Sequence, residues 1–366
     1  MQKPAKKRAK TIDGNAFTRL LLKWNQQKNK REMPWKGEKN PYKIWLSEII
    51  LQQTRVEQGL DYYHRFIQKF PDIKKLANAK DAIIFKLWEG LGYYTRCRNL
   101  ISTARFISKE LDGRFPHSYP AIKDLKGVGP YTAAAISSFA FNLPYAVVDG
   151  NVSRVLARVF GIKKTIDSTK GKKLISMLAD ELLDKKQPGI YNQAIMDFGA
   201  VVCKPLAPLC SNCIFKNACF AFLNDKVKKF PVKSKRITIR ERWFNYFVFV
   251  GENGFIIQQR KSKDIWNQLY EFPLIERKGN ATVENILEEA ATLGWLKKSK
   301  YEMVKISPLY KQRLTHQLII VQFIEIKLNE KTKLKKDQLR VTPNQLRKFP
   351  FPGVINQYLK AGIRGE

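Results

Sequence analysis

The chain has 366 residues, with 67 Lys and Arg against 32 Asp and Glu and a formal net charge of +35. This length predicts two or three domains, each able to bury its own core. No apolar run approaches membrane-spanning length, so the sequence argues against a membrane protein. The charge favours a polyanionic partner, although a general enrichment in lysine would give the same number.

Residues 1–10 contain five Lys or Arg residues. They form no apolar stretch of the kind that a secretory signal requires, so we expect a disordered basic tail and an intracellular protein. Such a tail can contact DNA or simply keep the chain in solution.

The first predicted helix, Thr11–Gln27, carries Phe17, Leu21 and Trp24 on one stripe, with Asp13 as its cap. A second helix is expected to open at Asn40, because Asn is a good cap and the proline that follows suits the first helical position.

Glu48 interrupts the apolar part of this second helix. Helical spacing brings to its carboxyl group the side chains of Ile44, Trp45, Leu51 and Gln52. A buried carboxyl group has a raised pKa and can hold a proton near neutral pH, as a general acid must. A solvated position at the edge of the stripe is the alternative.

Further helices are predicted at Val56–Phe70, Ala82–Trp88 and Asn99–Leu111. Between the last two, Gly90–Arg96 forms a glycine-rich turn that presents Tyr93 beside arginine. Aromatic rings next to cations suit insertion between bases and binding of a nucleic-acid backbone. A loop whose tyrosines only cover the core is equally compatible.

Two short helices, Pro120–Leu125 and Tyr131–Phe141, flank a hairpin that contains Gly127 and Gly129. The glycines allow a tight turn and leave backbone N–H groups uncovered, and the second helix directs its N-terminus at the same place. This hairpin is therefore predicted to bind phosphate.

Asp149 follows this helix and precedes another at Val152–Phe160. Taken alone, Asp149 or Asn151 has the ordinary role of capping that helix. After it, Gly171–Asp184 and Pro188–Val202 are predicted to be helical and no segment up to residue 202 alternates as a strand does, so this region is predicted to be all-α.

Four cysteines lie within seventeen residues with the spacing C-x6-C-x2-C-x5-C, namely Cys203, Cys210, Cys213 and Cys219. Four thiolates suit a structural zinc ion or a [4Fe–4S] cluster, and disulfides are the weakest option inside a cell. A zinc knot commonly has two C-x2-C pairs, whereas this chain has one, which favours the cluster. Cys97 remains as an expected buried thiol.

The composition changes after the cysteines, because residues 224–240 form a basic, polar connector. Beyond it, Phe244–Val248, Phe255–Gln259 and Gln317–Leu328 are predicted strands, and Val283–Leu293 a helix. The C-terminal part is therefore predicted to be an α+β domain.

The hairpin LKGVGPYTA, the VDGNV segment and the cysteine spacing together resemble the helix-hairpin-helix DNA glycosylases of the endonuclease III superfamily. Within that superfamily the chain looks like the MutY-type adenine DNA glycosylases, by Pro34-Trp35, WLSEIILQQTRV at Trp45–Val56 and GLGYY at Gly90–Tyr94. The resemblance is dense from about residue 15 to residue 222. It implies a helix-hairpin-helix glycosylase domain at 11–223, with the cluster loop at 203–219.

The resemblance implies base-excision repair, in which adenine paired with 8-oxoguanine or guanine is flipped out of duplex DNA and removed. Glu48 matches the family's general acid, and Asp149 the carboxylate that stabilises the sugar cation. Asn151 matches a residue that orients Glu48. Gln52, Gln53 and Tyr93 are expected to contact DNA, the last two by filling or wedging the stack.

Tyr131 stands where the endonuclease III branch has the lysine that forms a Schiff base. A phenol cannot form an imine, so a monofunctional glycosylase is favoured over a bifunctional pyrimidine glycosylase and lyase. The Tyr131 hydroxyl can hydrogen-bond Asp149 or the sugar, or simply pack. A catalytically silent iron–sulfur protein that scans DNA is a third possibility, against which both carboxylates argue.

Residues 241–366 resemble, more weakly, the Nudix-like domain of the same family, by LYEFP at Leu269–Pro273 and FPFP at Phe349–Pro352. The metal-binding helix of Nudix hydrolases is absent, so we expect lesion recognition without nucleotide hydrolysis. Leu314, Thr315 and His316 align with the family's Phe-Ser-His loop, and Thr315 and His316 supply the donor and acceptor for 8-oxoguanine. The expected partner is duplex DNA with this mispair, bound by a monomer in the cytoplasm or nucleoid if the cell is bacterial.

Overall fold

The computed structural model describes residues 12–234, 238–251, 254–262, 264–296, 301–328 and 334–362. They fall into two compact units, Met1–Ala77 with Ser102–Lys235 and Asn78–Ile101 with Arg236–Glu366. The expected basic tail at 1–10 lies outside the described residues, as does part of the connector, residues 235–237. Among the described helices, none combines the length and the apolar character that crossing a bilayer requires.

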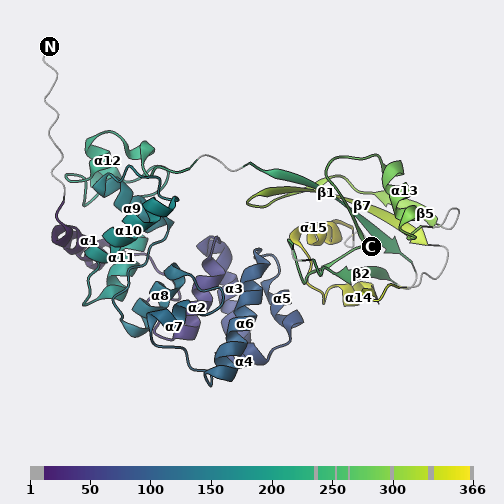
Figure 1. Ribbon diagram of the computed structural model, residues 1–366, viewed down its shortest axis with the longest axis horizontal. Helices are drawn as coiled ribbons and strands as arrows, with labels where there is room; N and C mark the ends of the chain where they lie inside the picture. The colour runs from purple at the N-terminus through teal and green to yellow at the C-terminus, as the bar shows by residue number, and fades with distance from the viewer. Residues whose placement is uncertain are drawn as a thin grey trace, which may run out of the picture. The chain divides into compact units, whose positions relative to one another are not determined.

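Every regular element described before Arg240 is helical, as the sequence predicts (Figure 1). These elements are α1 (Gly14–Lys28), α2 (Pro41–Leu51), α3 (Val56–Lys69), α4 (Ile73–Asn78), α5 (Asp81–Trp88), α6 (Tyr94–Glu110), α7 (Tyr119–Lys123), α8 (Pro130–Phe141), α9 (Gly150–Phe160), α10 (Thr169–Leu182), α11 (Pro188–Val201), η1 (Cys210–Asn212), α12 (Phe220–Leu223) and η2 (Val227–Lys229).

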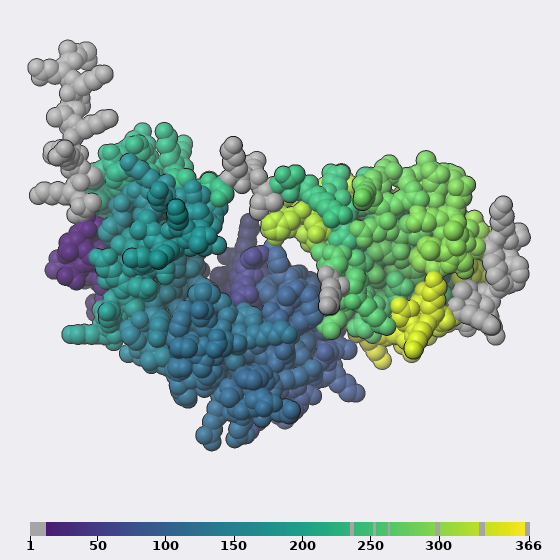
Figure 2. Space-filling model, in the orientation of Figure 1, coloured from purple at the N-terminus to yellow at the C-terminus, as the bar shows by residue number. Residues whose placement is uncertain are grey.

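Helix α1 begins where Asp13 accepts a 3.3 Å hydrogen bond from the backbone N–H of Ala16. Its stripe of Phe17, Leu21 and Trp24 is buried, in a core that α9, α10 and α11 also line. In the space-filling view the purple residues of α1 lie against the teal residues of this unit (Figure 2). An amphipathic face thus fixes the helix on its neighbours.

Helix α2 is buried along most of its length. Asn40 caps it by accepting a 2.9 Å hydrogen bond from the N–H of Tyr42, and Pro41 occupies its first turn. Every side chain from Ile44 to Ile50 is buried, including that of Glu48. A helix that is apolar all round belongs in the interior, and this one carries its single carboxyl group there.

The turn after α5 ends earlier than expected, since α6 begins at Tyr94 and not at Asn99. Gly90, Gly92 and Tyr93 all have positive φ angles, of 91°, 77° and 48°. The N–H of Arg96 then bonds the carbonyl of Tyr93 at 2.8 Å, which starts the helix at once. Three left-handed positions within four residues complete the reversal.

The hairpin between α7 and α8 has the predicted form. Gly127 has a φ of 82°, a conformation that favours glycine, and the N–H of Val128 bonds the carbonyl of Leu125 at 3.0 Å. Gly129 is the N-cap of α8 and no side chain caps that helix. The first N–H groups of α8 therefore remain for an external acceptor.

The C-terminal part contains two sheets (Figure 1). The larger has the order β4-β1-β7-β5 with β6 also paired to β7, and the smaller has the order β3-β2-β8. Strands β1 and β7 run parallel, while the other pairs are antiparallel. The strands are β1 (Arg240–Val250), β2 (Phe255–Gln259), β3 (Tyr270–Glu271), β4 (Leu274–Arg277), β5 (Tyr301–Ile306), β6 (Tyr310–Arg313), β7 (Gln317–Leu328) and β8 (Gln338–Val341).

Alternating side chains place helices on the two faces of the larger sheet. Phe247 and Ile324 belong to the core that includes α13 (Val283–Thr292). Phe323 stacks on Tyr358 of α15 (Gly353–Gly362) with the ring centroids 3.9 Å apart. A further short helix, α14, spans Pro343–Leu346. The predicted α+β character is therefore confirmed, although strands β3 to β6 and β8 were not predicted.

Candidate active site

A pocket of about 380 Å³ lies within the first unit, lined by residues of α2, α8, α9 and α11 and by the segment between α1 and α2. Its polar lining includes Arg31, Glu48, Tyr131, Asp149, Asn151 and Gln193. Four of the predicted catalytic residues are thus brought together from three helices that are separate in the sequence. The volume falls in the range of small-molecule sites.

Glu48 lies on α2 at the wall of this pocket and is only 7% exposed. Burial raises the pKa of its carboxyl group to about 7, partly opposed by a hydrogen bond with Tyr131 and assisted by the nearby charge of Asp149. The solvated alternative is therefore wrong. A carboxyl group with such a pKa can hold and release a proton at neutral pH.

Asp149 combines two roles that the sequence left as alternatives. It is the N-cap of α9, where Oδ1 accepts a 2.7 Å hydrogen bond from the N–H of Val152, and it also lines the pocket. Burial raises the pKa of its carboxyl group, while the hydrogen bonds from Val152 and Asn151 lower it. Both oxygens are bonded, so the carboxylate has a fixed orientation.

Asn151 bonds Asp149, whereas the resemblance implied that it orients Glu48. Its Nδ2 donates to Oδ2 of Asp149 at 2.7 Å, and its Oδ1 accepts from Nη2 of Arg154 at 2.8 Å. Arg154 also donates to the carbonyls of Gly199 and Cys203, each at 2.8 Å. The amide is thereby held in one orientation by a buried guanidinium group.

Tyr131 lines the same pocket from the first turn of α8. Its hydroxyl group hydrogen-bonds Glu48 and lies 3.9 Å from Sδ of Met196. Burial raises the pKa of this phenol well above its ordinary value, and the charges of Glu48 and Asp149 raise it further. Tyr131 therefore stays protonated and serves as a donor.

The sequence did not single out Asp197, although it organises one wall of the pocket. This carboxylate on α11 is fully buried and accepts hydrogen bonds from four side chains. Their donor atoms and distances are Asn29 Nδ2 at 2.8 Å, Arg31 Nη1 at 2.8 Å, Lys36 Nζ at 3.3 Å and Gln193 Nε2 at 2.9 Å. The segment between α1 and α2 is thus tied to α11.

The other expected DNA-contacting residues of the first unit lie outside the pocket lining. Gln52 is the C-cap of α2, and its Nε2 donates to Oγ1 of Thr132 at 3.3 Å. Gln53 is exposed and has a φ of 56°. This left-handed position directly after a buried helix presents the side chain of Gln53 to solvent. Gly127 and Gly129 lie in the hairpin of the same unit.

Tyr93, Thr315 and His316 belong to the second unit. Tyr93 is 47% exposed, and its hydroxyl oxygen lies 2.7 Å from Oγ1 of Thr315. Thr315 and His316 are exposed and lie in the turn between β6 and β7. The structure therefore joins two residues that sequence reasoning treated separately.

The described cysteines are all free thiols, and Cys97 is buried as expected. Cys203, Cys210, Cys213 and Cys219 line one small pocket with apolar walls. Within the described ranges no set of three or more His, Cys, Asp or Glu side chains is arranged to hold a metal ion. Four sulfur donors from one loop nevertheless match the ligand chemistry of zinc or an iron–sulfur cluster.

Two family models match the chain. The HhH-GPD superfamily of base excision DNA repair proteins matches residues 46–181, and the NUDIX domain matches residues 245–361. The first match contains Glu48 and Asp149, and the second contains Thr315 and His316.

The chain is 34% identical over 317 residues to an adenine DNA glycosylase of Buchnera aphidicola subsp. Baizongia pistaciae, with 86% of this chain and 87% of that relative covered. It is 43% identical over 219 residues to the adenine DNA glycosylase of Mus musculus, covering 57% of this chain and 42% of the relative. Among solved structures, a thermostable thymine-DNA glycosylase matches with a TM-score of 0.53 and 29% identity, covering 58% of this chain and 97% of the other.

Proposed function

The chain belongs to the adenine DNA glycosylase family, and from this premise we propose that it hydrolyses the N-glycosidic bond of adenine paired with 8-oxoguanine or guanine in duplex DNA. The observation that carries the proposal is the pairing of Glu48 and Asp149 in one pocket, with burial raising the pKa of Glu48 to about 7. Two carboxyl groups in different environments are the usual means of cleaving a bond to a sugar carbon.

Glu48 acts as the general acid. Its proton goes to N7 of the flipped adenine while the bond between C1′ and N9 breaks, and the bonding electron pair stays on the base, which leaves neutral. Asp149, held as a carboxylate by Val152 and Asn151, stabilises the positive charge that develops on the sugar. Water then attacks C1′ and gives a proton to the Glu48 carboxylate, which restores the acid.

Arg31 and Gln193 line one side of the pocket and supply polar groups that can hydrogen-bond the base. Both side chains are fixed by Asp197, so their remaining groups have defined directions. A purine with an exocyclic amino group needs an acceptor and donors held at its edge, and a Gln carbonyl and a guanidinium group provide them. We assign adenine recognition to this wall.

DNA binding is assigned to the hairpin and to the exposed turns. The hairpin of Gly127 and Gly129, with the first turn of α8 that no side chain caps, suits a phosphate oxygen. Gln53 and Tyr93 have the exposure needed to fill the stack from which adenine leaves, and Gln52, next to Gln53 in the chain, is assigned a DNA contact as well. In this assignment residues 11–223 form the glycosylase domain and residues 224–240 the connector. Residues 241–366 form the domain that recognises 8-oxoguanine through Thr315 and His316. The protein is proposed to act on DNA as a monomer inside the cell.

The four cysteines are assigned to a [4Fe–4S] cluster. Cys203, Cys210, Cys213 and Cys219 would hold it, and the apolar walls around them suit a cluster shielded from solvent. A cluster supplies electron-transfer chemistry and a rigid loop. No step of adenine hydrolysis needs it, because the acid and the carboxylate come from the chain itself.

The experiment that tests this function is incubation with a duplex that carries one 8-oxoguanine:adenine pair. Adenine should be released and an abasic site formed, with strand cleavage only after alkali, because Tyr131 cannot form a Schiff base. If borohydride traps a stoichiometric covalent complex, a bifunctional glycosylase and lyase is favoured. If the duplex is bound and adenine stays attached, a scanning protein without catalysis is favoured.

A further inference from the structure

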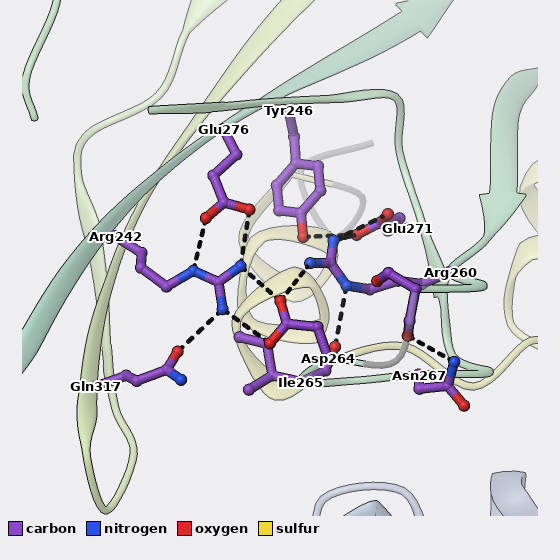
Figure 3. Close-up of polar contacts among 10 residues, drawn as sticks. Arg242, Tyr246, Arg260, Asp264, Ile265, Asn267, Glu271, Glu276 and Gln317 are labelled. Atoms are coloured by element: carbon purple, nitrogen blue, oxygen red, sulfur yellow. Dashed lines mark hydrogen bonds and ion pairs between the residues drawn. The ribbon is translucent and has the colours of Figure 1, made fainter. Parts of the chain in front are cut away.

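Arg242 of β1 is buried and uses all five of its N–H donors in one polar cluster (Figure 3). Nε and Nη2 donate to the two oxygens of Glu276, each at 2.7 Å. Nη1 and Nη2 donate to the two oxygens of Asp264, at 3.1 and 2.6 Å. The fifth donor, on Nη1, reaches Oε1 of Gln317 at 3.0 Å. A guanidinium group held this way cannot turn without losing several bonds.

A second arginine braces the same cluster. Nη2 of Arg260 donates to Asp264 at 3.1 Å, and Nη1 donates to both oxygens of Glu271, which also accepts a 3.1 Å hydrogen bond from the hydroxyl of Tyr246. Both guanidinium groups lie over the ring of Phe244, at 4.9 and 5.3 Å from its centroid. Each arginine is about 8% exposed or less.

Such a cluster fixes the directions of its side chains and contributes little to the stability of the fold. Arg242 and Arg260 are buried, whereas Asp264 and Glu276 are about a third exposed. Removing the two guanidinium groups from water costs solvation free energy that apolar residues of the same size would not cost, so the cluster is a poor way to stabilise a core. Its bonds are directional, however, and they join β1, β4, the Arg260–Leu269 segment and the first residue of β7. Through this cluster Arg242 fixes the orientation of the Gln317 side chain.

Gln317 comes directly after the turn that carries Thr315 and His316. The N–H of Leu314 bonds the carbonyl of Gln317 at 2.8 Å and closes this turn, while the N–H of Arg240 bonds the carbonyl of His316 at 3.1 Å. Thr315 and His316 are exposed, whereas the side chain of Gln317 points into the cluster (Figure 3). Thr315 and His316 are thus adjacent to a residue, Gln317, whose side chain Arg242 holds in place.

We propose that Arg242 and Gln317 are a positioning pair for recognition of 8-oxoguanine, an inference that rests on the proposed role of Thr315 and His316. Distinguishing 8-oxoguanine from guanine requires a donor and an acceptor held at one edge of the base, and a turn that moves by an ångström loses that distinction. The hydrogen bond between Nη1 of Arg242 and Oε1 of Gln317 holds the turn without touching DNA.

The test compares Gln317→Met, which removes the acceptor and keeps the shape, with Gln317→Glu, which keeps an acceptor for Arg242. Single-turnover adenine release is measured on duplexes with 8-oxoguanine:adenine and with guanine:adenine. Gln317→Met should lower the ratio of the two rates about fivefold, the effect of losing a hydrogen bond of typical net strength. Gln317→Glu should restore most of that ratio.

The matched control is Gln322→Met, on the same strand and similarly half-buried but outside the cluster. It should leave the ratio unchanged. A purely structural effect would lower the melting temperature of Gln317→Met and reduce both rates equally. That result, or an equal loss of the ratio in Gln317→Met and Gln317→Glu, would overturn the positioning pair.

The double change Thr315→Ala/His316→Ala separates this inference from the proposed function. It should lower the same ratio by about ten- to a hundredfold, the usual effect of losing a specific base contact. If it does so while Gln317→Met has no effect, the turn reads the lesion and the positioning pair is wrong. If neither variant lowers the ratio, the turn is not the reader and both ideas fall.

Discussion

Nδ2 of Asn151 lies 2.7 Å from Oδ2 of Asp149, and this amide occupies the one carboxylate oxygen that the cap of α9 leaves open. The N–H of Val152 occupies the other oxygen at 2.7 Å. Burial raises the pKa of Asp149, and these two hydrogen bonds lower it, so they favour the charged form that burial opposes. The same residue therefore caps the start of α9 and presents an oriented carboxyl group to the pocket.

Replacing either carboxyl group should abolish adenine release without loss of folding. Asp149→Asn keeps a side chain that caps helices well, so α9 should remain intact. Glu48→Gln keeps the shape of the buried group. We expect each variant to lose about 100- to 10,000-fold in the single-turnover rate, the usual contribution of a catalytic acid or base. Binding of the duplex with 8-oxoguanine:adenine should persist in a gel-shift assay.

Asp61→Asn is the matched control, because Asp61 is an exposed carboxylate on α3 of the same unit. It should release adenine at the rate of the unchanged chain. Excision within a few-fold of normal in Asp149→Asn or Glu48→Gln would show that the assignment of the catalytic groups is wrong.

The rate of adenine release should fall as pH rises above about 7. Glu48 must be protonated to act as an acid, and burial raises its pKa to about 7, so each further pH unit should cost about tenfold in kcat/KM. Tyr131 donates a hydrogen bond that lowers this pKa. Tyr131→Phe should therefore move the alkaline decline of kcat/KM to higher pH. A decline at the same pH, or at a lower pH, would contradict the contact between Tyr131 and Glu48.

Glu48→Gln should stabilise the fold at alkaline pH. The pKa of Glu48 is raised in the folded chain from an ordinary 4.5 to about 7, so the folded state binds the proton more tightly than the unfolded state does. The associated stability is complete below pH 4.5 and is lost as pH rises through 7, by about 3 kcal/mol. Glutamine is neutral throughout and escapes that loss.

Urea unfolding of both proteins at pH 5 and pH 8 checks this expectation. The difference in the free energy of unfolding should be small at pH 5 and should favour Glu48→Gln at pH 8. An equal difference at the two pH values would show that the carboxyl group is solvated in the folded chain.

The purified protein should be brown and contain about four iron atoms per chain, as a cluster held by four cysteines requires. Cys213→Ser should lower the iron content and the visible absorbance. Cys97→Ala should leave both unchanged, because Cys97 is buried on α6, outside the cysteine loop. One zinc atom per chain with no iron would refute the cluster, whatever the activity of the preparation.

Local patterns drew attention to Glu48 and Asp149 but left each with an ordinary alternative. Glu48 stands in an apolar run and Asp149 sits between two helices, and the family resemblance was needed to assign them catalytic roles. Asp197 had the same signal, since Ile195, Met196 and Phe198 surround it on α11, and an isolated carboxylate there could have been noticed. Its donors could not have been named, because Arg31 lies 166 residues away.

The role of Arg242 could not be predicted from the sequence. In a chain rich in cations nothing distinguishes this arginine, and its partners Asp264, Glu276 and Gln317 lie 22, 34 and 75 residues away. The short strands β5 and β6 were missed for a related reason. Most of their side chains are exposed or half-buried, so pairing with β7, more than a local apolar pattern, makes them strands.

The burial of α2 from Ile44 to Ile50 has a consequence for the order of events in the proposed reaction. A helix held in this way cannot swing its carboxyl group towards a base that remains stacked, so the adenine would have to cover the whole distance. The waiting time of a bound complex would then be set by how often the duplex opens at that pair, and easily deformed neighbouring base steps would shorten it. In that case the speed of repair would depend on the surrounding DNA sequence as much as on the protein.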